Sequence, residues 1–173
     1  MANYIGNFKD KNNNILVDDD IIKSSSCGTL WNNSVVDFND GDTTWATHDV
    51  VFNGEWSWNG NGYLIDDGNG KSISIGDNVS LVKVSGWVAI SYADRNNSLE
   101  LHIKKNDNYT GIVAFTVKTQ GYGTITLSIP PTQLYVNKGD KISLSVSNAA
   151  GGKITLYSDT GRPVTALQVE VIK

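Results

Sequence analysis

Residues 81–92 read LVKVSGWVAISY, and apolar side chains occupy nearly every second position of this stretch. Successive side chains of a β-strand point to opposite faces, so Val84 and Val88 share one face while Trp87 lies on the other. The length and regularity of the alternation predict a long strand with one buried face. The Trp87 side chain on the opposite face must then be buried separately, either by a second core or by another subunit.

The same period-two alternation recurs in most other apolar segments, and no stretch has a helical period long enough for a helix, apart from a possible turn at 18–23. Pro130 and Pro131 cannot donate to a strand ladder, so we expect them at an edge or in a loop that ends a strand. Runs rich in Asn, Asp and Gly separate the alternating segments at a spacing typical of an antiparallel sandwich or barrel. The alternating segments are 99–104, 113–118, 125–129, 142–146, 154–156 and 167–171, and the turn-forming runs are 59–62, 67–70, 95–97, 106–108, 137–140 and 149–152.

Composition agrees with an all-β chain. The 173 residues include 19 Asn, 17 Gly, 16 Ser and 13 Thr, which favour turns and strand faces over helix interiors. Charged residues make up only 18% and hydrophobic residues 39%. These values argue against a helical bundle, a coiled coil, a disordered chain and an integral membrane protein.

Charge and cysteine content exclude further classes. Fourteen Lys and Arg against 18 Asp and Glu give a formal charge of −4. The chain therefore lacks the excess of basic side chains with which a nucleic-acid-binding protein contacts phosphates. Cys27 is the single cysteine, so no disulfide forms within the chain; we expect it to be a small buried side chain. The first residues contain no signal-peptide pattern. We therefore expect a protein that stays in the cell that makes it or leaves as part of an assembly.

The chain divides into two parts. Residues 1–27 combine a predicted hairpin tip at 10–14 with the polar runs 18–20 and 24–26, and they read as an N-terminal arm or attachment segment. Residues 28–173 read as one globular domain, which is long enough to bury a core.

The sequence offers little for catalysis or for metal binding. No Gly-x-Ser-x-Gly elbow is present. His102 lies on the polar face of a predicted strand and is expected to be an exposed strand residue, and His48 also lacks a catalytic context. We therefore predict a protein that is not an enzyme and has no cofactor. Residues 37–42 superficially resemble a calcium loop but fail the EF-hand spacing. The acidic runs 18–20 and 66–67 also carry oxygen ligands, yet Asx turns explain them equally well, and no metal site is predicted.

Aromatic residues are the most informative candidates for binding. Trp56 and Trp58 lie two residues apart and project from one strand face, and Tyr63 follows closely. Flat aromatic faces beside Asn side chains are what a sugar-binding surface uses, so these three residues are the predicted ligand-binding set. Packing in the core or between subunits is the alternative for the same side chains. Trp87 is the predicted subunit-interface residue.

Four strand patterns carry a resemblance to a known family. The segment SISIGDNVSLVKVSGW at 72–87 is followed by LHIKKN at 101–106, NKGDKISL at 137–144 and ALQVEVI at 166–172. In this order they resemble C1q/TNF-like jelly-roll domains of tail and fibre proteins from phages of Gram-positive bacteria. The stretch 4–16 is similar to the start of phage structural proteins. Residues 28–71 resemble the jelly-roll domains only in the number of strands.

The resemblance implies an all-β antiparallel jelly-roll sandwich of about ten strands that assembles as a homotrimer. It implies a non-enzymatic virion protein, associated with the tail, baseplate or fibre, which is assembled in the host cytoplasm. On this reading the domain binds a host-surface saccharide for attachment, and residues 1–27 contact other virion proteins; no nucleic-acid or membrane partner is expected. The alternatives are a capsid head-fibre or decoration protein without an adhesive role, and a bacterial carbohydrate-binding module or lectin.

Overall fold

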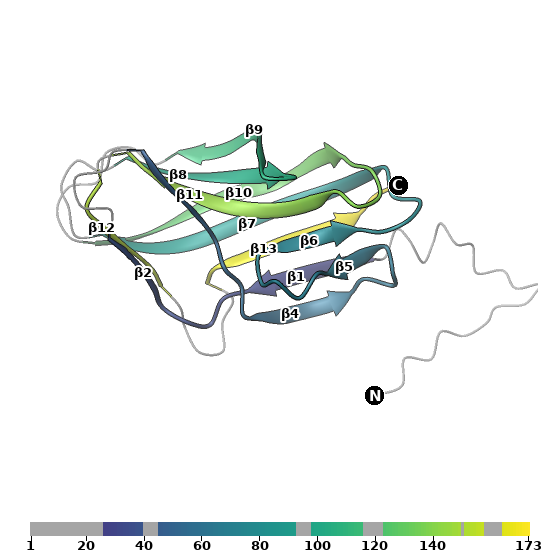
Figure 1. The fold of residues 1–173 in the computed structure, drawn as a ribbon, viewed down its shortest axis with the longest axis horizontal. Helices are drawn as coiled ribbons and strands as arrows, with labels where there is room; N and C mark the ends of the chain where they lie inside the picture. Colours follow the sequence, from purple (N-terminus) through teal and green to yellow (C-terminus); the bar gives the residue numbers. More distant parts are fainter. Residues whose placement is uncertain (1–25, 40–44, 93–97, 116–122, 150, 158–163) are drawn as a thin grey trace, which may run out of the picture.

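The protein, described here from a computed structural model, is a sandwich of two antiparallel β-sheets (Figure 1). The structure describes residues 26–39, 45–92, 98–115, 123–149, 151–157 and 164–173. The first sheet contains β1 (Cys27–Trp31), β2 (Val36–Asn39), β4 (Gly54–Asn59), β7 (Leu81–Tyr92), β10 (Gly123–Tyr135), β12 (Lys153–Leu156) and β13 (Ala166–Val171). The second contains β3 (Ala46–Asp49), β5 (Leu64–Asp66), β6 (Ser72–Ile75), β8 (Leu99–Lys105), β9 (Asn108–Phe115) and β11 (Lys141–Asn148).

The predicted long strand, β7, organises the first sheet. It pairs with β10 along one edge and with β13 and then β12 along the other, and β1 and β4 continue the sheet beyond β13. In the second sheet β11 pairs with β8 on one side and with β6 and then β3 on the other. The all-β antiparallel sandwich is therefore confirmed.

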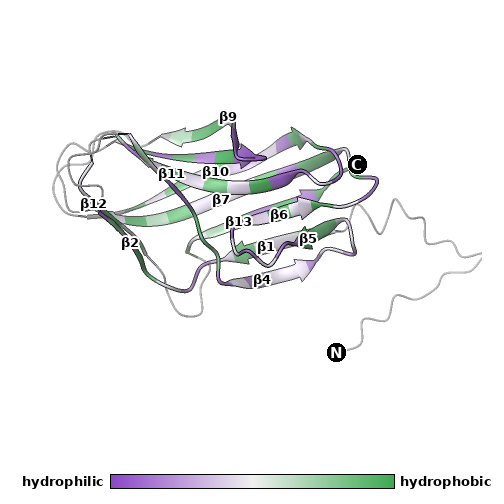
Figure 2. Ribbon diagram, viewed as in Figure 1, coloured by the Kyte–Doolittle hydropathy of each residue, from purple (hydrophilic) through white to green (hydrophobic). Residues whose placement is uncertain are grey.

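Alternation sorts the side chains of both sheets into an inner and an outer set. The inward residues of β7, such as Val84 and Val88, are fully buried, as is Leu144 of β11. Figure 2 shows the resulting alternation of hydrophobic and hydrophilic residues along these strands. Gly86 also points inward, and a Cβ at that position would lie 2.8 Å from the methyl carbons of Leu144. The glycine therefore lets the two sheets approach each other closely.

The two consecutive prolines lie inside a strand. Pro130 and Pro131 belong to β10, whose pairing with β7 shifts register between Ile129 and Thr132. Their position on a strand that pairs with β7 at one edge agrees with the predicted edge location, but they do not end the strand. The bulge accommodates them because it interrupts the ladder where their missing N–H groups would have been needed.

Two tight turns that the sequence predicts are held together at one end of the second sheet. Asn106 and Asp107 both have positive φ, as a two-residue type I′ hairpin between β8 and β9 requires. Asp140, before β11, accepts hydrogen bonds from the Asn106 side chain at 2.7 Å and from the Asn137 N–H at 2.9 Å. Burial alone would raise the pKa of Asp140, but these hydrogen bonds and the nearby Lys105 charge hold that pKa below its ordinary value.

Some details differ from the sequence-based expectations. Thirteen strands are assigned in the described residues, compared with about ten predicted, and the short strands β2, β3 and β5 fall in the region where the pattern was weakest. Cys27 opens β1 and is half-buried, although a buried thiol was expected. Ser26 accepts a hydrogen bond from the Val171 N–H. Residues 1–25 of the predicted arm, including the possible turn at 18–23, lie outside the described residues.

Replacing Asp140 by Asn tests the link between the two turns. The depressed pKa means that the carboxylate stabilises the fold fully above pH 4, and that this stabilisation is lost as the pH falls through the folded-state pKa. We expect Asp140→Asn to lower the free energy of unfolding at pH 7 by on the order of 1 kcal/mol. As the pH falls below 3.8, the difference should shrink, because the carboxyl is protonated first in the unfolded state and its stabilising contribution is progressively lost. Urea denaturation at pH 7 and pH 3 measures both values.

Asp77→Asn is the matched control, because Asp77 pairs with Lys138 at 2.8 Å while remaining largely exposed. We expect this substitution to change the stability little at either pH. An Asp140→Asn deficit that is equally large at pH 3 and pH 7 would mean that the carboxylate charge is not what stabilises the turns.

Candidate functional site

The outward face of the first sheet contains few charges. Trp87 of β7 is half-buried and lies in register with Ser128 of β10 and Ala166 of β13, and Trp31 of β1 lies beyond Ala166. The two tryptophans therefore stand on one row of this face, with an alanine between them. We call the surrounding residues the neutral face: Thr29, Trp31, Ser85, Trp87, Ala89, Thr126, Ser128, Ala166 and Gln168.

At one end of the neutral face, two charged side chains occur together as an ion pair. Lys83 of β7 and Glu170 of β13 are cross-strand neighbours and form an ion pair. Among the described outward residues of β1, β7, β10 and β13 these are the only charged side chains. The face can therefore be covered without desolvating an isolated charge, which is the costly part of burying a protein surface.

Trp58 lies against the neighbouring strand. It is half-buried, packs against the hydrophobic core and lies opposite Gly28 in the pairing of β4 with β1. A Cβ on Gly28 would come within 2.5 Å of the Trp58 ring, so the indole covers the space that the glycine leaves. At least part of the Trp58 ring thus has a structural role.

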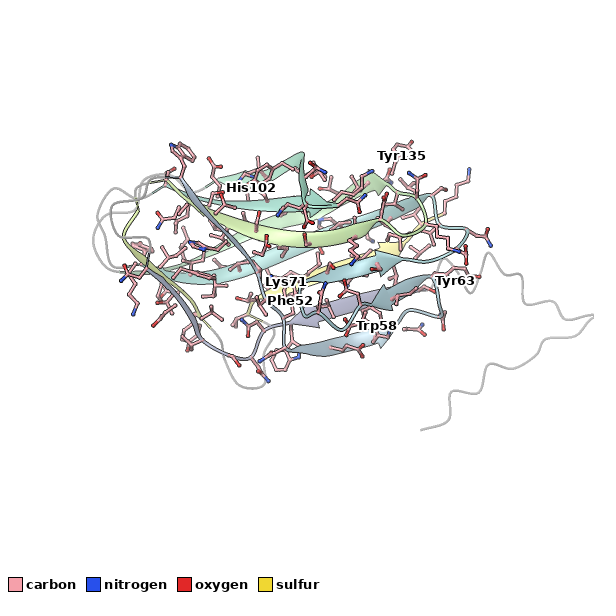
Figure 3. All side chains as sticks on the ribbon, in the orientation of Figure 1. Phe52, Trp58, Tyr63, Lys71, His102 and Tyr135 are labelled. Atoms are coloured by element: carbon pink, nitrogen blue, oxygen red, sulfur yellow. The ribbon has the colours of Figure 1, made fainter. Side chains whose placement is uncertain are left out.

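Tyr63 lies just past the turn that joins β4 to β5 (Figure 3). Its N–H donates to the Gly60 carbonyl at 2.8 Å, and Asn61 and Gly62 in the turn have positive φ. Its side chain is half-buried and packs against the core, as that of Trp58 does. The structure describes the backbone of Trp56 but not its side chain. The assignment of the three aromatics to a ligand site stays a prediction.

The outward face of the second sheet is charged, in contrast to the neutral face. His102 of β8 was expected to be an exposed strand residue, but its side chain is only 16% exposed. It pairs with Glu100 at 3.1 Å and packs against the Tyr109 ring, with 4.8 Å between the ring centroids. Because ring packing and the paired carboxylate cover its imidazole, His102 is far less accessible than alternation alone indicated. His48 of β3 packs instead against Phe38 of the first sheet, with 4.0 Å between the ring centroids.

A cavity of about 350 Å³ opens on this charged face. Its walls come from β3, β6, β8 and β11 and from the loops before β6 and after β8. Every lining residue is polar or charged: Asp49, Asn69, Lys71, Ser72, Lys104, Asp107, Lys141 and Ser143. We call this cavity the lysine pocket. Figure 3 labels Lys71, which belongs to the segment leading into β6.

The register explains how separate segments build the lysine pocket. Ser143 of β11 lies between Ser72 of β6 and Lys104 of β8 in one row of the sheet. Asp49 reaches the same row from β3 and accepts a hydrogen bond from Lys104 Nζ at 3.0 Å. The alternating pattern placed Lys104 only within the segment 99–104 and did not link it to β6 or β3. Alternating polar residues mark the outward face, but strand order determines which of them meet.

The acidic loop between β5 and β6 serves the backbone and the pocket wall. Asp66 accepts a hydrogen bond from the Gly68 N–H at 3.0 Å, and Asp67 accepts one from the Ser72 hydroxyl at 2.6 Å. The Asp66 contact is the Asx-type turn that the sequence allowed as the alternative to calcium, and the Asp67 contact ties the loop to the start of β6. In the described part of the chain, no three His, Cys, Asp or Glu side chains gather where they could hold a metal ion. The run 18–20 and residues 40–42 lie outside that part.

Comparisons with known proteins identify the fold. No family model matches the sequence, and no curated protein matches it. Murine APRIL at pH 5.0 is similar in structure, with a TM-score of 0.57 and 14% identity over 85% of this chain and 98% of the other. The Eiger TNF of S. frugiperda has a TM-score of 0.57 and 13% identity over 86% and 92% of the two chains. The domain therefore has a TNF-like jelly-roll fold, as the strand patterns predicted.

No helix among the described residues has both the length and the apolar character needed to cross a membrane.

Removing the Trp58 ring separates a structural role from a ligand-binding role. We expect Trp58→Ala to lower the free energy of unfolding by on the order of 2 kcal/mol, because it exposes core side chains and leaves space above Gly28. Chemical denaturation measures this change. The control is Tyr135→Ala, which removes an aromatic ring that is 79% exposed. If Trp58→Ala is as stable as the control, the ring does not support the core and is available to a ligand.

Proposed function

We propose that this chain is a non-enzymatic, homotrimeric virion protein of a phage, which binds a saccharide on the host surface. The observation that carries the proposal is the difference between the two outward faces of the sandwich. One face is almost free of charge and contains two half-buried tryptophans, and the other is built from paired charges and hydroxyl groups.

The neutral face supports assembly. Tryptophan is enriched, and charged residues are depleted, at the centres of protein interfaces. Lys83 and Glu170 neutralise each other in an ion pair. Contact with a second copy therefore need not bury an unpaired charge in the interface. A closed ring of three copies would let the neutral face of each protomer lie toward the symmetry axis.

The charged face supports contact with a hydrophilic ligand. Carboxylate, amide, hydroxyl and ammonium groups can match the dense hydroxyl groups of a saccharide, and they converge in the lysine pocket. The strand patterns at 72–87, 101–106, 137–144 and 166–172 support a virion origin through their resemblance to phage tail and fibre domains. Residues 1–27 would join the domain to other virion proteins. In this proposal the saccharide stays chemically unchanged.

A charge placed on the neutral face tests the assembly. We expect wild-type protein to scatter light as a particle of three times 18.8 kDa. Thr126 is exposed on the neutral face opposite Ala89, so Thr126→Glu should leave the fold intact and dissociate the trimer, because the new carboxylates would be desolvated. Light scattering coupled to gel filtration measures the mass of both proteins.

Ser74→Glu is the matched control, since it adds the same charge to the outward face of the second sheet. It should stay trimeric. A wild-type protein that is monomeric at every concentration would rule out the proposed assembly, and loss of the trimer in both variants would place the interface elsewhere.

Saccharide binding is tested by presenting the wild-type trimer with a glycan array that holds cell-wall and capsular saccharides of Gram-positive bacteria together with plant and animal storage polysaccharides. We expect selective binding to a hydrophilic saccharide. Heat-unfolded protein controls for non-specific adhesion. A trimer that binds none of them would favour a capsid head-fibre or decoration role. Binding to plant or animal storage polysaccharides alone would favour a bacterial carbohydrate-binding module.

A further inference from the structure

We propose that the lysine pocket binds a sugar or polyol unit that carries one anionic group, either a carboxylate or a phosphate. This inference rests on the proposed saccharide-binding function and assigns it a different location from the predicted Trp56, Trp58 and Tyr63 set. It follows from the charge balance of the pocket, from its hydrophilic lining and from its size.

The charge balance leaves one ammonium group available. Lys104 pairs with Asp49 at 3.0 Å, and its side chain is only 11% exposed, so this charge is fixed in the wall. Lys141 pairs with Asp67 at 3.5 Å. Lys71 is exposed and forms no ion pair with any residue that the structure describes. A ligand anion beside Lys71 would therefore gain a partner without displacing an existing one.

The remaining acid on the lining does not cancel this charge. Asp107 is 4.0 Å from Lys104, and its side chain is 92% exposed, so it stands in solvent at the rim. Water and salt weaken its influence on a charge held inside the pocket. Asp67, which neutralises Lys141, also accepts hydrogen bonds from Ser72 and from the Asn69 side chain. Its oxygens are thus committed to the protein and do not repel a ligand as a free carboxylate would.

The hydrophilic lining of the lysine pocket indicates the chemistry of the uncharged part of the ligand. Ser143 lies in the middle of the pocket row and Ser72 of β6 lies beside it, so serine hydroxyl groups line the pocket next to the charged side chains. No apolar side chain lines the pocket, which excludes a lipid or an aromatic ligand as the best fit. The hydroxyl groups of a polyol can form hydrogen bonds with these polar lining side chains.

The size of the pocket limits the ligand to one unit at a time. A volume of about 350 Å³ is at the lower end of small-molecule pockets. The pocket opens on an outward sheet face, so the neighbouring units of a longer chain could continue over the surface. The whole chain has a formal charge of −4, and a general attraction of anions is therefore not expected. Binding of an anion at this place would be a property of the pocket.

Titration followed by amide chemical shifts tests the proposal with defined probes. D-glucuronate supplies the carboxylate, glycerol 3-phosphate supplies the phosphate, and D-glucose is the neutral comparison. We expect either anionic probe to shift the amide signals of Ser72 and Ser143 and to bind more tightly than D-glucose. Lys71→Glu should weaken that binding by about tenfold or more, because a charge-assisted contact is replaced by repulsion. Lys71→Gln should weaken it less.

Lys138→Glu is the matched control, since Lys138 is 70% exposed, pairs with Asp77 and is not among the lining residues. It changes the net charge equally and should leave the affinity unchanged. The proposal is overturned if Lys138→Glu weakens binding as much as Lys71→Glu, or if D-glucose binds as tightly as both anionic probes. It is also overturned if neither anionic probe shifts the pocket signals.

The glycan array separates this inference from the proposed function. If the wild-type protein and Lys71→Glu bind the array saccharides equally well, saccharide binding stands and the pocket assignment fails. If D-glucuronate or glycerol 3-phosphate binds the pocket while no array saccharide is bound, the pocket assignment stands and the attachment role fails. The stronger of the two anionic probes then shows whether a carboxylate or a phosphate is preferred.

Discussion

The structure depends on one strand, β7, which must fit against four neighbouring strands at once. β7 pairs with β10 along one edge and with β13 and β12 along the other, and its inward side chains meet β11 of the opposite sheet. A one-residue slip in its register would turn its valines to the outside and Lys83 and Trp87 to the inside. The alternation of residues 81–92 is therefore constrained by pairing and packing together. Gly86 adds a further restriction, because a side chain there would meet Leu144.

Local patterns were sufficient to predict the fold class and most of the longer strands. Alternation located β7, β8, β11 and β13, and Asn-Asp and Asn-Lys-Gly-Asp runs located two of the turns. The same information failed for the short strands β2, β3 and β5, where three or four residues carry too little periodic signal. It also misjudged the exposure of His102, because Tyr109 and Glu100 reach that side chain across and along the sheet.

The candidate sites show why function is harder to predict than fold. Trp58 was selected from the sequence for its chemistry, but its position opposite Gly28 explains part of its presence by packing. The lysine pocket was missed, because its walls come from segments far apart in the sequence that only the strand order brings together. By contrast, Trp87 was placed correctly on the outer face of its strand, since that inference needed only the alternation of a single segment. The sequence thus predicts which face of a single strand a residue lies on more readily than which residues of four different strands lie together.

Pro130 and Pro131 have a consequence for the behaviour of the protein at high concentration. A sheet edge with free N–H and C=O groups can recruit a strand from another molecule and begin a fibril. On β10 the two prolines remove consecutive donors, and the bulge between Ile129 and Thr132 bends the strand at the same place. Copies that collide along this edge therefore cannot extend a continuous ladder across it. The bulged strand therefore opposes edge-to-edge pairing between copies of the protein.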